Sequence, residues 1–204
     1  MKVLLINGSP NEHGCTYTAL HEIEKTLNAE GISTEMFHVG TEPLPGCSGC
    51  NGCADSSRCV YDDRVNDALE IAEGCDAYII GSPVHYAGIA GDMKSFLDRF
   101  FWAGSHRLKL GAAVVSCRRA GSTATLDGLN KYMTISEMPV VSAGYWNMVH
   151  GRTPEEVVQD LEGMQVMRTL GRNMAWLLKS IEAGKQAGLP LPEGEEKIRT
   201  NFIR

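Results

Sequence analysis

The sequence predicts a single α/β domain in which helices cover both faces of a doubly wound, five-stranded parallel sheet. Short continuous apolar runs, such as residues 3–6, end at turn residues, as strands buried on both faces do. Apolar residues spaced three or four apart lie between these runs and indicate helices. Because strands and helices alternate, crossover helices join parallel strands. A chain of 204 residues is long enough to bury one large core of this kind.

The first half of the chain contains two predicted strands and two predicted helices. Residues 3–6 form the first strand, which ends at Asn7-Gly8. Residues 33–39 mix polar and apolar side chains, so we expect the second strand to lie at an edge of the sheet. The two helices are marked by apolar residues that share one face: Leu20, Ile23 and Leu27 in the first, and Val65, Ala68, Leu69 and Ala72 in the second.

The second half continues the alternation. Two more buried strands are predicted at residues 77–80 and 112–115, and a short fifth strand at residues 140–141. A helix between the first two of these carries Met93, Phe96, Leu97 and Phe100 on one face, and further helices are predicted at 125–138 and 154–187. The last helix starts with proline at its first position, Pro154 behind Thr153.

An edge position for the second strand favours the strand order 2-1-3-4-5. In such sheets ligands bind beyond the carboxyl ends of the strands, where the strand order reverses. We expect one domain over residues 1–187, with a cysteine-rich loop at 46–60, and a tail at 188–204 that is available to pack on another subunit.

Composition restricts the class of partner and the compartment. The net charge of −6 and the lack of a Lys/Arg-rich run argue against nucleic acid or an anionic membrane as a partner. Lys2 is followed by only four apolar residues, too few for a signal peptide or a membrane span. Seven cysteines, an odd number, indicate free thiols in a reducing cytoplasm.

Four of the cysteines form a compact motif. Cys47, Cys50, Cys53 and Cys59 follow the pattern C-x2-C-x2-C-x5-C on a glycine-rich loop. Thiolates in this arrangement can surround an iron–sulfur cluster, with all four on one cluster. Zinc is the rival ligand, although structural zinc sites usually consist of two separated C-x2-C pairs. Four reduced thiols with nothing bound are the third alternative.

The loop after the first strand has the composition of a phosphate site. Residues 8–16 match neither G-x-x-x-x-G-K-[ST] nor G-x-G-x-x-G, which argues against ATP and against a primary dinucleotide site. The loop offers hydroxyls at Ser9 and Thr16 and the backbone N–H groups of a starting helix, which suit a terminal phosphate. The alternative is an ordinary turn in which Thr16 caps the helix.

Two further loops leave the same edge of the predicted sheet. Residues 81–88 bring apolar and aromatic groups beside a rigid proline and could hold a flat ring. Residues 116–122 carry Arg118 and Arg119, one of which could face a ring that becomes anionic on reduction. The alternatives are a solvated or subunit-facing arginine pair and, for His85, a surface histidine.

Together these residues resemble the group of NADPH-dependent FMN reductases and iron–sulfur flavoproteins, over residues 2 to about 145. The resemblance rests on Gly8-Ser9-Pro10 with Gly14 and Thr16, on the four cysteines leading to Asp62-Asp63, and on Gly81-Ser82-Pro83-Val84 with Lys94 and Asp98-Arg99. It implies a flavodoxin-like fold, bound FMN, dimers or tetramers, and a [4Fe–4S] cluster on the cysteine motif.

The resemblance also implies a role for each matching residue. FMN phosphate would be bound in the loop of Ser9, Asn11, Cys15 and Thr16; the isoalloxazine would pack on Pro83, Val84, His85 and Tyr86; and Ser116, Arg118, Arg119 and Gly121 would border it. This chain departs from the family at two of these positions, because the family usually has Asn where Cys15 stands and Tyr where His85 stands.

The predicted function is an FMN-dependent oxidoreductase that takes electrons from NAD(P)H and passes them to a small molecule or an electron-transfer protein. In such an enzyme the flavin supplies the redox chemistry and the protein supplies binding and electrostatics. The first alternative is a non-catalytic FMN and iron–sulfur carrier that exchanges electrons with ferredoxin. A metal-stapled binding protein without flavin is the second.

Overall fold

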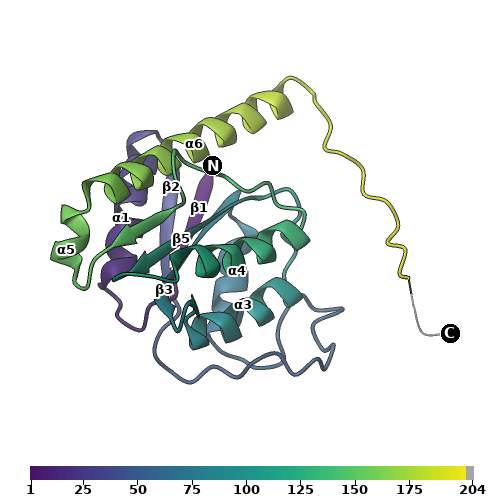
Figure 1. Cartoon of the computed structure of the whole chain (residues 1–204). Helices are drawn as coiled ribbons and strands as arrows, with labels where there is room; N and C mark the ends of the chain where they lie inside the picture. The colour runs from purple at the N-terminus through teal and green to yellow at the C-terminus, as the bar shows by residue number, and fades with distance from the viewer. Residues whose placement is uncertain (201–204) are drawn as a thin grey trace.

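The computed structural model describes residues 1–200 and shows a mainly parallel sheet between two layers of helices (Figure 1). Five parallel strands lie in the order β2-β1-β3-β5-β6, which is the predicted doubly wound order. Their bounds are Lys2–Asn7 for β1, Ser33–His38 for β2, Ala77–His85 for β3, Leu110–Cys117 for β5 and Met148–His150 for β6. The mixed-polarity strand β2 lies at an edge, as its sequence predicts.

Helices cover both faces of the sheet because the side chains of its buried strands alternate. In β1, Leu4 and Ile6 face one helix layer, whereas Val3 and Leu5 face the other. The first layer contains α2 (Arg64–Glu73), α3 (Gly91–Ala103) and α4 (Ser122–Ile135). The second contains α1 (Cys15–Ala29), α5 (Pro154–Gln159) and α6 (Leu161–Gln186).

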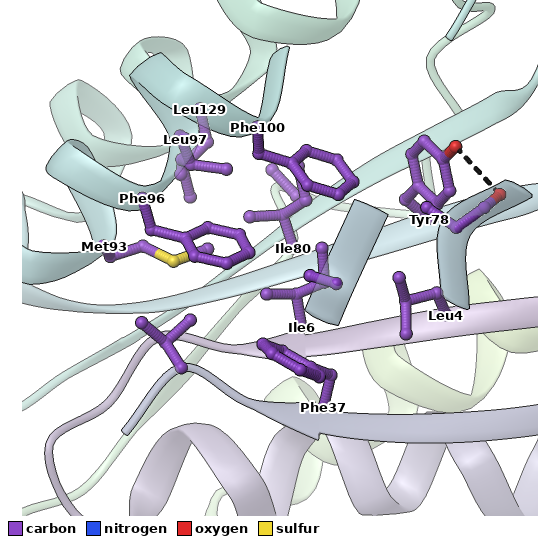
Figure 2. Packing of buried hydrophobic residues seen from close by; sticks show 14 of the residues in the cluster. Leu4, Ile6, Phe37, Tyr78, Ile80, Met93, Phe96, Leu97, Phe100 and Leu129 are labelled. Atoms are coloured by element: carbon purple, nitrogen blue, oxygen red, sulfur yellow. Dashed lines mark hydrogen bonds between the residues drawn. The ribbon is translucent and has the colours of Figure 1, made fainter. Parts of the chain in front are cut away.

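The core beneath α3 is aromatic. Phe96 and Phe100 stack with ring centroids 5.5 Å apart, and Tyr78 of β3 meets Phe100 edge to face (Figure 2). The Tyr78 hydroxyl donates a 3.3 Å hydrogen bond to the Ala72 carbonyl, so its polar end is satisfied although the side chain is buried. This packing holds α3 rigidly against the sheet.

The structure corrects the prediction for the fifth strand. Residues 140–141 form no strand, and only Val140 makes an isolated bridge, to Gly111. The fifth parallel strand is β6, which pairs with the end of β5. A three-residue strand is too short to show a period in the sequence, and the apolar pair Val140-Val141 in the preceding loop looks equally like a short strand.

Two further elements differ from the prediction. The expected helix at 154–187 is broken at Asp160, whose side chain caps α6 by accepting a 2.9 Å hydrogen bond from the Gly163 N–H. After β3 the chain turns into a two-residue strand, β4 (Gly88–Ile89), which forms an antiparallel hairpin with the end of β3. The helix predicted at 125–138 is α4 and starts earlier, at Ser122.

The segment after α6 is extended and leaves the body of the molecule in Figure 1. Arg107 donates a 3.0 Å hydrogen bond to the Pro192 carbonyl and contacts this segment near its middle. The last four residues of the predicted tail, 201–204, lie outside the described residues. Within residues 1–200, no helix is both long enough and apolar enough to cross a membrane.

Candidate functional site

The loops that follow β1, β5 and β6 meet the last residues of β3 and β5 around one open cavity of about 210 Å³, here called the carboxyl-edge cavity. It lies beyond the carboxyl ends of the central strands, where the strand order reverses. The residues that line it are Ser9, Asn11, Cys15, Thr16, Pro83, Val84, His85, Ser116, Cys117, Arg118, Gly151 and Arg152. Nine of the twelve predicted flavin-site residues are therefore brought together by the fold.

The first of these loops is shaped by its own hydrogen bonds. Ser9 is buried, and its Oγ accepts a 3.1 Å bond from the Asn11 N–H. The Ser9 N–H donates to Asn7 Oδ1 at 3.1 Å, and the ring of His38 on β2 contacts the Ser9 carbonyl through Nε2 at 2.8 Å. These hydrogen bonds define the conformation of the loop.

The loop ends at the start of α1, whose first residues, Cys15 and Thr16, line the cavity. Gly14 is the N-cap of α1 and has no side chain to accept from the first-turn N–H groups, and the first turn holds no acidic residue. A helix start of this kind attracts an anion through its N–H groups and its dipole. Thr16 is therefore not the cap. Its Oγ1 shares a 2.8 Å hydrogen bond with Ser116 Oγ of β5, which ties α1 to the third loop.

The end of β3, which was predicted as part of the second loop, supplies the apolar side of the cavity. Pro83 and Val84 are half-buried, and His85 is exposed at its rim. Tyr86, by contrast, does not line the cavity: it is fully exposed at the tip of the β3–β4 hairpin, with φ of 49°. The structure does not bring its ring to the other predicted site residues.

In the third loop the two arginines lie differently. Arg118 lines the cavity, whereas Arg119 is exposed and does not. Gly121 also lies outside the lining, and its φ of 91° is a backbone conformation that side chains disfavour. A Cβ added there would lie 2.7 Å from the Ala87 Cα. Gly121 thus lets α4 start close against the β3–β4 hairpin.

Cys117, which lies within the predicted third loop, also lines the cavity, and two lining residues, Gly151 and Arg152, were not predicted. Gly151 and Arg152 follow β6, the strand whose position was predicted wrongly. The apolar pair Met148-Val149 is the local pattern that could have indicated β6. The Cys15 thiol donates a 3.7 Å bond to the Gly151 carbonyl, which links α1 to this loop. Burial raises the pKa of both Cys15 and Cys117, so both are neutral thiols near pH 7.

The four clustered cysteines line a second, smaller cavity of about 20 Å³, here called the cysteine cavity. Its walls come from the loop itself and from the end of α3: Ser48, Asn51, Val60, Tyr61, Arg99, Trp102 and Ala103. Cys53 and Cys59 are half-buried, whereas Cys47 and Cys50 are exposed. The two cavities share no lining residue.

Cys59 is held in position by hydrogen bonds to its backbone and to its sulfur. Its backbone N–H donates a 2.8 Å bond to Asn66 Oδ1, and its carbonyl accepts a 3.0 Å bond from Asn66 Nδ2. Its sulfur accepts a 3.1 Å bond from Nε of Arg99. Asn66 lies in the first turn of α2 and is buried, so the position of Cys59 is set by two helices.

The donor set of the cysteine cavity matches that of a [4Fe–4S] cluster, which takes one thiolate on each of four irons. All seven cysteines of the chain are free thiols, so none of the four is used in a disulfide. Within residues 1–200, no three or more His, Cys, Asp or Glu side chains are arranged around the position of a single metal ion. The four cysteines nevertheless fit the cluster by donor chemistry and by the cavity that they share, because each would bind a different iron and they need not converge on one ion.

Comparison with known proteins places the chain in a family. The profile described as NADPH-dependent FMN reductase matches residues 1–153. An iron–sulfur flavoprotein of Methanocaldococcus jannaschii is 30% identical over 197 residues, which cover 89% of this chain and 100% of that protein.

Solved structures agree on the fold. An archaeal flavodoxin superposes with a TM-score of 0.61 at 17% identity, covering 88% of this chain and 99% of the flavodoxin. An NADH:FMN oxidoreductase superposes with a TM-score of 0.63 at 17% identity, covering 86% of this chain and 89% of that one. At such low identity these likenesses concern the fold alone, and they confirm the flavodoxin-like prediction. With the family profile matching three quarters of its length, the chain belongs to the NADPH-dependent FMN reductase family.

Proposed function

We propose that this protein is an FMN-dependent oxidoreductase that takes electrons from NAD(P)H and passes them to a small-molecule or protein acceptor. The observation that carries the proposal is the carboxyl-edge cavity, in which an uncapped helix start, an apolar loop and an arginine meet. These are the features needed for a phosphate, a flat ring and a ring that gains negative charge. Family membership and the names of the relatives support the same cofactor.

Each loop has a distinct task in this proposal. The N–H groups at the start of α1, with the hydroxyls of Ser9 and Thr16, bind the FMN phosphate. Pro83 and Val84 pack against the ring, and Arg118 stabilises negative charge on it. When bound, FMN supplies the transfer of a hydride or of single electrons. The neutral thiols of Cys15 and Cys117 add no charge that would repel the phosphate.

The proposal includes a [4Fe–4S] cluster held by Cys47, Cys50, Cys53 and Cys59. The shared cavity and the relative named as an iron–sulfur flavoprotein support this. Because the two cavities share no residue, FMN and the cluster are bound by separate parts of the chain. We further propose a homodimer or homotetramer in a reducing cytoplasm, where exposed thiols remain reduced.

The test is anaerobic purification followed by an absorption spectrum and by flavin, iron and zinc analysis. One FMN and about four irons per chain support the proposal. If the protein holds zinc, or no metal after anaerobic reconstitution with iron and sulfide, the cluster assignment is wrong and the flavin assignment is unaffected. The absence of flavin binding would contradict the whole proposal.

Turnover separates the enzyme from the electron carrier. Rapid reduction of the bound flavin by NADH or NADPH supports the oxidoreductase, and the faster of the two identifies the donor. Slow oxidation of both nucleotides, with fast electron exchange with ferredoxin, would favour the carrier instead.

A further inference from the structure

Arg99 is a buried cation in a helix whose other buried residues are mostly apolar. It lies near the end of α3, only 1% of the residue is exposed, and it is among the largest fully buried side chains in the described chain. Burying a charge costs free energy unless it is paired and hydrogen-bonded. The buried guanidinium of Arg99 therefore needs a counter-charge and hydrogen-bond acceptors close to it.

The guanidinium is paired with Asp63 in a two-pronged contact. Its two terminal nitrogens donate to the two carboxylate oxygens at 2.8 and 2.9 Å, the planar geometry that arginine but not lysine can adopt. Asp63 also caps α2, because its Oδ1 accepts from the Val65 N–H at 3.1 Å. The ion pair thus joins α3 to the start of α2.

The remaining donors of Arg99 reach both ends of the cysteine loop. One terminal nitrogen lies 3.4 Å from the Pro45 carbonyl, before Cys47, and the other lies 3.3 Å from the Tyr61 carbonyl, after Cys59. The guanidinium also lies over the Tyr61 ring at 4.9 Å. A single side chain therefore closes the base of the loop.

The last donor, Nε–H, points at a proposed cluster ligand. It reaches the Cys59 sulfur at 3.1 Å, and Arg99 itself lines the cysteine cavity. Cys47 and Cys50 are exposed to solvent, whereas Cys59 is half-buried and backed by this cation. The cavity is thus electrostatically asymmetric, with its positive side at Cys59.

We propose that Arg99 and Asp63 form a positioning pair that orients Cys59 as a ligand and sets the reduction potential of the cluster. This inference rests on the proposed cluster. Hydrogen bonds to ligand sulfurs and local charge are the levers by which proteins tune such potentials. Arg99 favours the reduced, more negative cluster, and Asp63 offsets part of that charge while holding the guanidinium in place.

The test is the order of cluster potentials in four proteins, measured by redox titration with electron paramagnetic resonance. Asp63→Asn leaves the cation unopposed and should raise the potential above that of the wild type. The double variant Arg99→Met/Asp63→Asn removes the hydrogen bond and both charges, and should lower it. Arg99→Met alone leaves a carboxylate unpaired, and should lower it most. Potentials that do not follow this order would overturn the proposal.

Arg99→Lys keeps a charge for Asp63 and tests the hydrogen bond if Arg99→Met fails to fold. Its potential should fall below that of the wild type, and an unchanged potential would contradict the inference. The matched control is the pair Arg168–Glu22, which joins α6 to α1 at 2.7 Å. Arg168→Met/Glu22→Gln should leave the cluster potential unchanged. If this control shifts the potential as much as the Arg99 and Asp63 variants do, Arg99 has only a structural role. A wild-type protein without iron would instead reject the cluster itself.

Discussion

Thr16 is the residue at which α1, β5 and the carboxyl-edge cavity meet. If its hydroxyl binds the FMN phosphate, Thr16→Ala should weaken FMN binding by about 1.5–3 kcal/mol, the worth of a hydrogen bond to a charged group. Riboflavin, which has no phosphate, should lose much less. Isothermal titration with both ligands measures the difference, and equal losses would show that the loop does not hold the phosphate.

Thr18→Ala is the matched control for this experiment. Thr18 lies one half-turn further along α1, and its Oγ1 donates a 3.1 Å bond to the Gly14 carbonyl. It does not line the cavity, so its removal should leave the affinity for both ligands close to that of the wild type.

The two neighbouring arginines should differ in their effect on the flavin. Arg118 lines the cavity and Arg119 does not, so only the first can favour negative charge on the reduced ring. Arg118→Met should therefore lower the two-electron FMN potential, whereas Arg119→Met should leave it near the wild-type value. Spectroelectrochemical titration of both variants measures the two potentials. A shift in the FMN potential of Arg119→Met alone would assign the role to Arg119 instead of Arg118.

At the scale of elements, the contact between α4 and the β3–β4 hairpin depends on a glycine. Gly121→Ala should destabilise the fold by about 1–3 kcal/mol, because a Cβ would enter a backbone conformation with φ of 91° and approach the Ala87 Cα to 2.7 Å. Urea unfolding measures this. Gly91→Ala, at the start of α3 with nothing within 4 Å of the added Cβ, should not destabilise the fold and should raise its stability by up to about 1 kcal/mol.

The packing of α3 on β3 should depend on pH through His106. This residue is 4% exposed, and burial lowers its pKa from 6.5 to about 4. Between about pH 4 and pH 6.5, His106 binds a proton in the unfolded chain but not in the folded chain. The free energy of unfolding therefore falls as the pH drops through this range. Between pH 7 and pH 5 the loss from this group is about 2 kcal/mol.

Urea unfolding at the two pH values, compared between wild type and His106→Gln, isolates this contribution. The variant should show a smaller loss of stability on acidification, because the carboxylates that titrate in both proteins cancel in the comparison. Equal losses would show that His106 is not the group responsible.

At the scale of the whole molecule, the two cavities should behave independently. Changing any one of Cys47, Cys50, Cys53 or Cys59 to Ala should lower the iron content well below the wild-type value of about four per chain, because each iron takes one thiolate. FMN should stay bound, since no residue lines both cavities. Iron and flavin analysis of anaerobically prepared variants provides the check.

Cys75→Ala is the matched control for the cysteine variants. Cys75 is buried and lines neither cavity, so its variant should keep both the iron and the flavin of the wild type. Loss of iron in this variant would show that any cysteine change disturbs the site, and loss of FMN in the loop variants would contradict the independence of the two cavities.

Local patterns in the sequence determined most of the fold and of the flavin loops. Strands β1, β3 and β5 are continuous apolar runs, and the helices carry apolar residues at helical spacing, so a short window suffices to find them. The strand order followed from the edge position of the second strand, and the parallel direction of the strands followed from the crossover helices between them. The cysteine motif and the loops at 8–16 and 81–88 were found for the same reason, since their residues are neighbours in the chain.

Only the tertiary structure decided which residues from distant segments meet. Strand β6 is three residues long and is held by pairing with β5, so its loop brought Gly151 and Arg152 into the cavity without a local signal. Arg99 bonds to a sulfur 40 residues away, and its helical spacing alone says only that it lies on α3. The physical reason is that periodicity reports which face of an element is buried, whereas contacts between elements depend on long-range packing that no single segment contains.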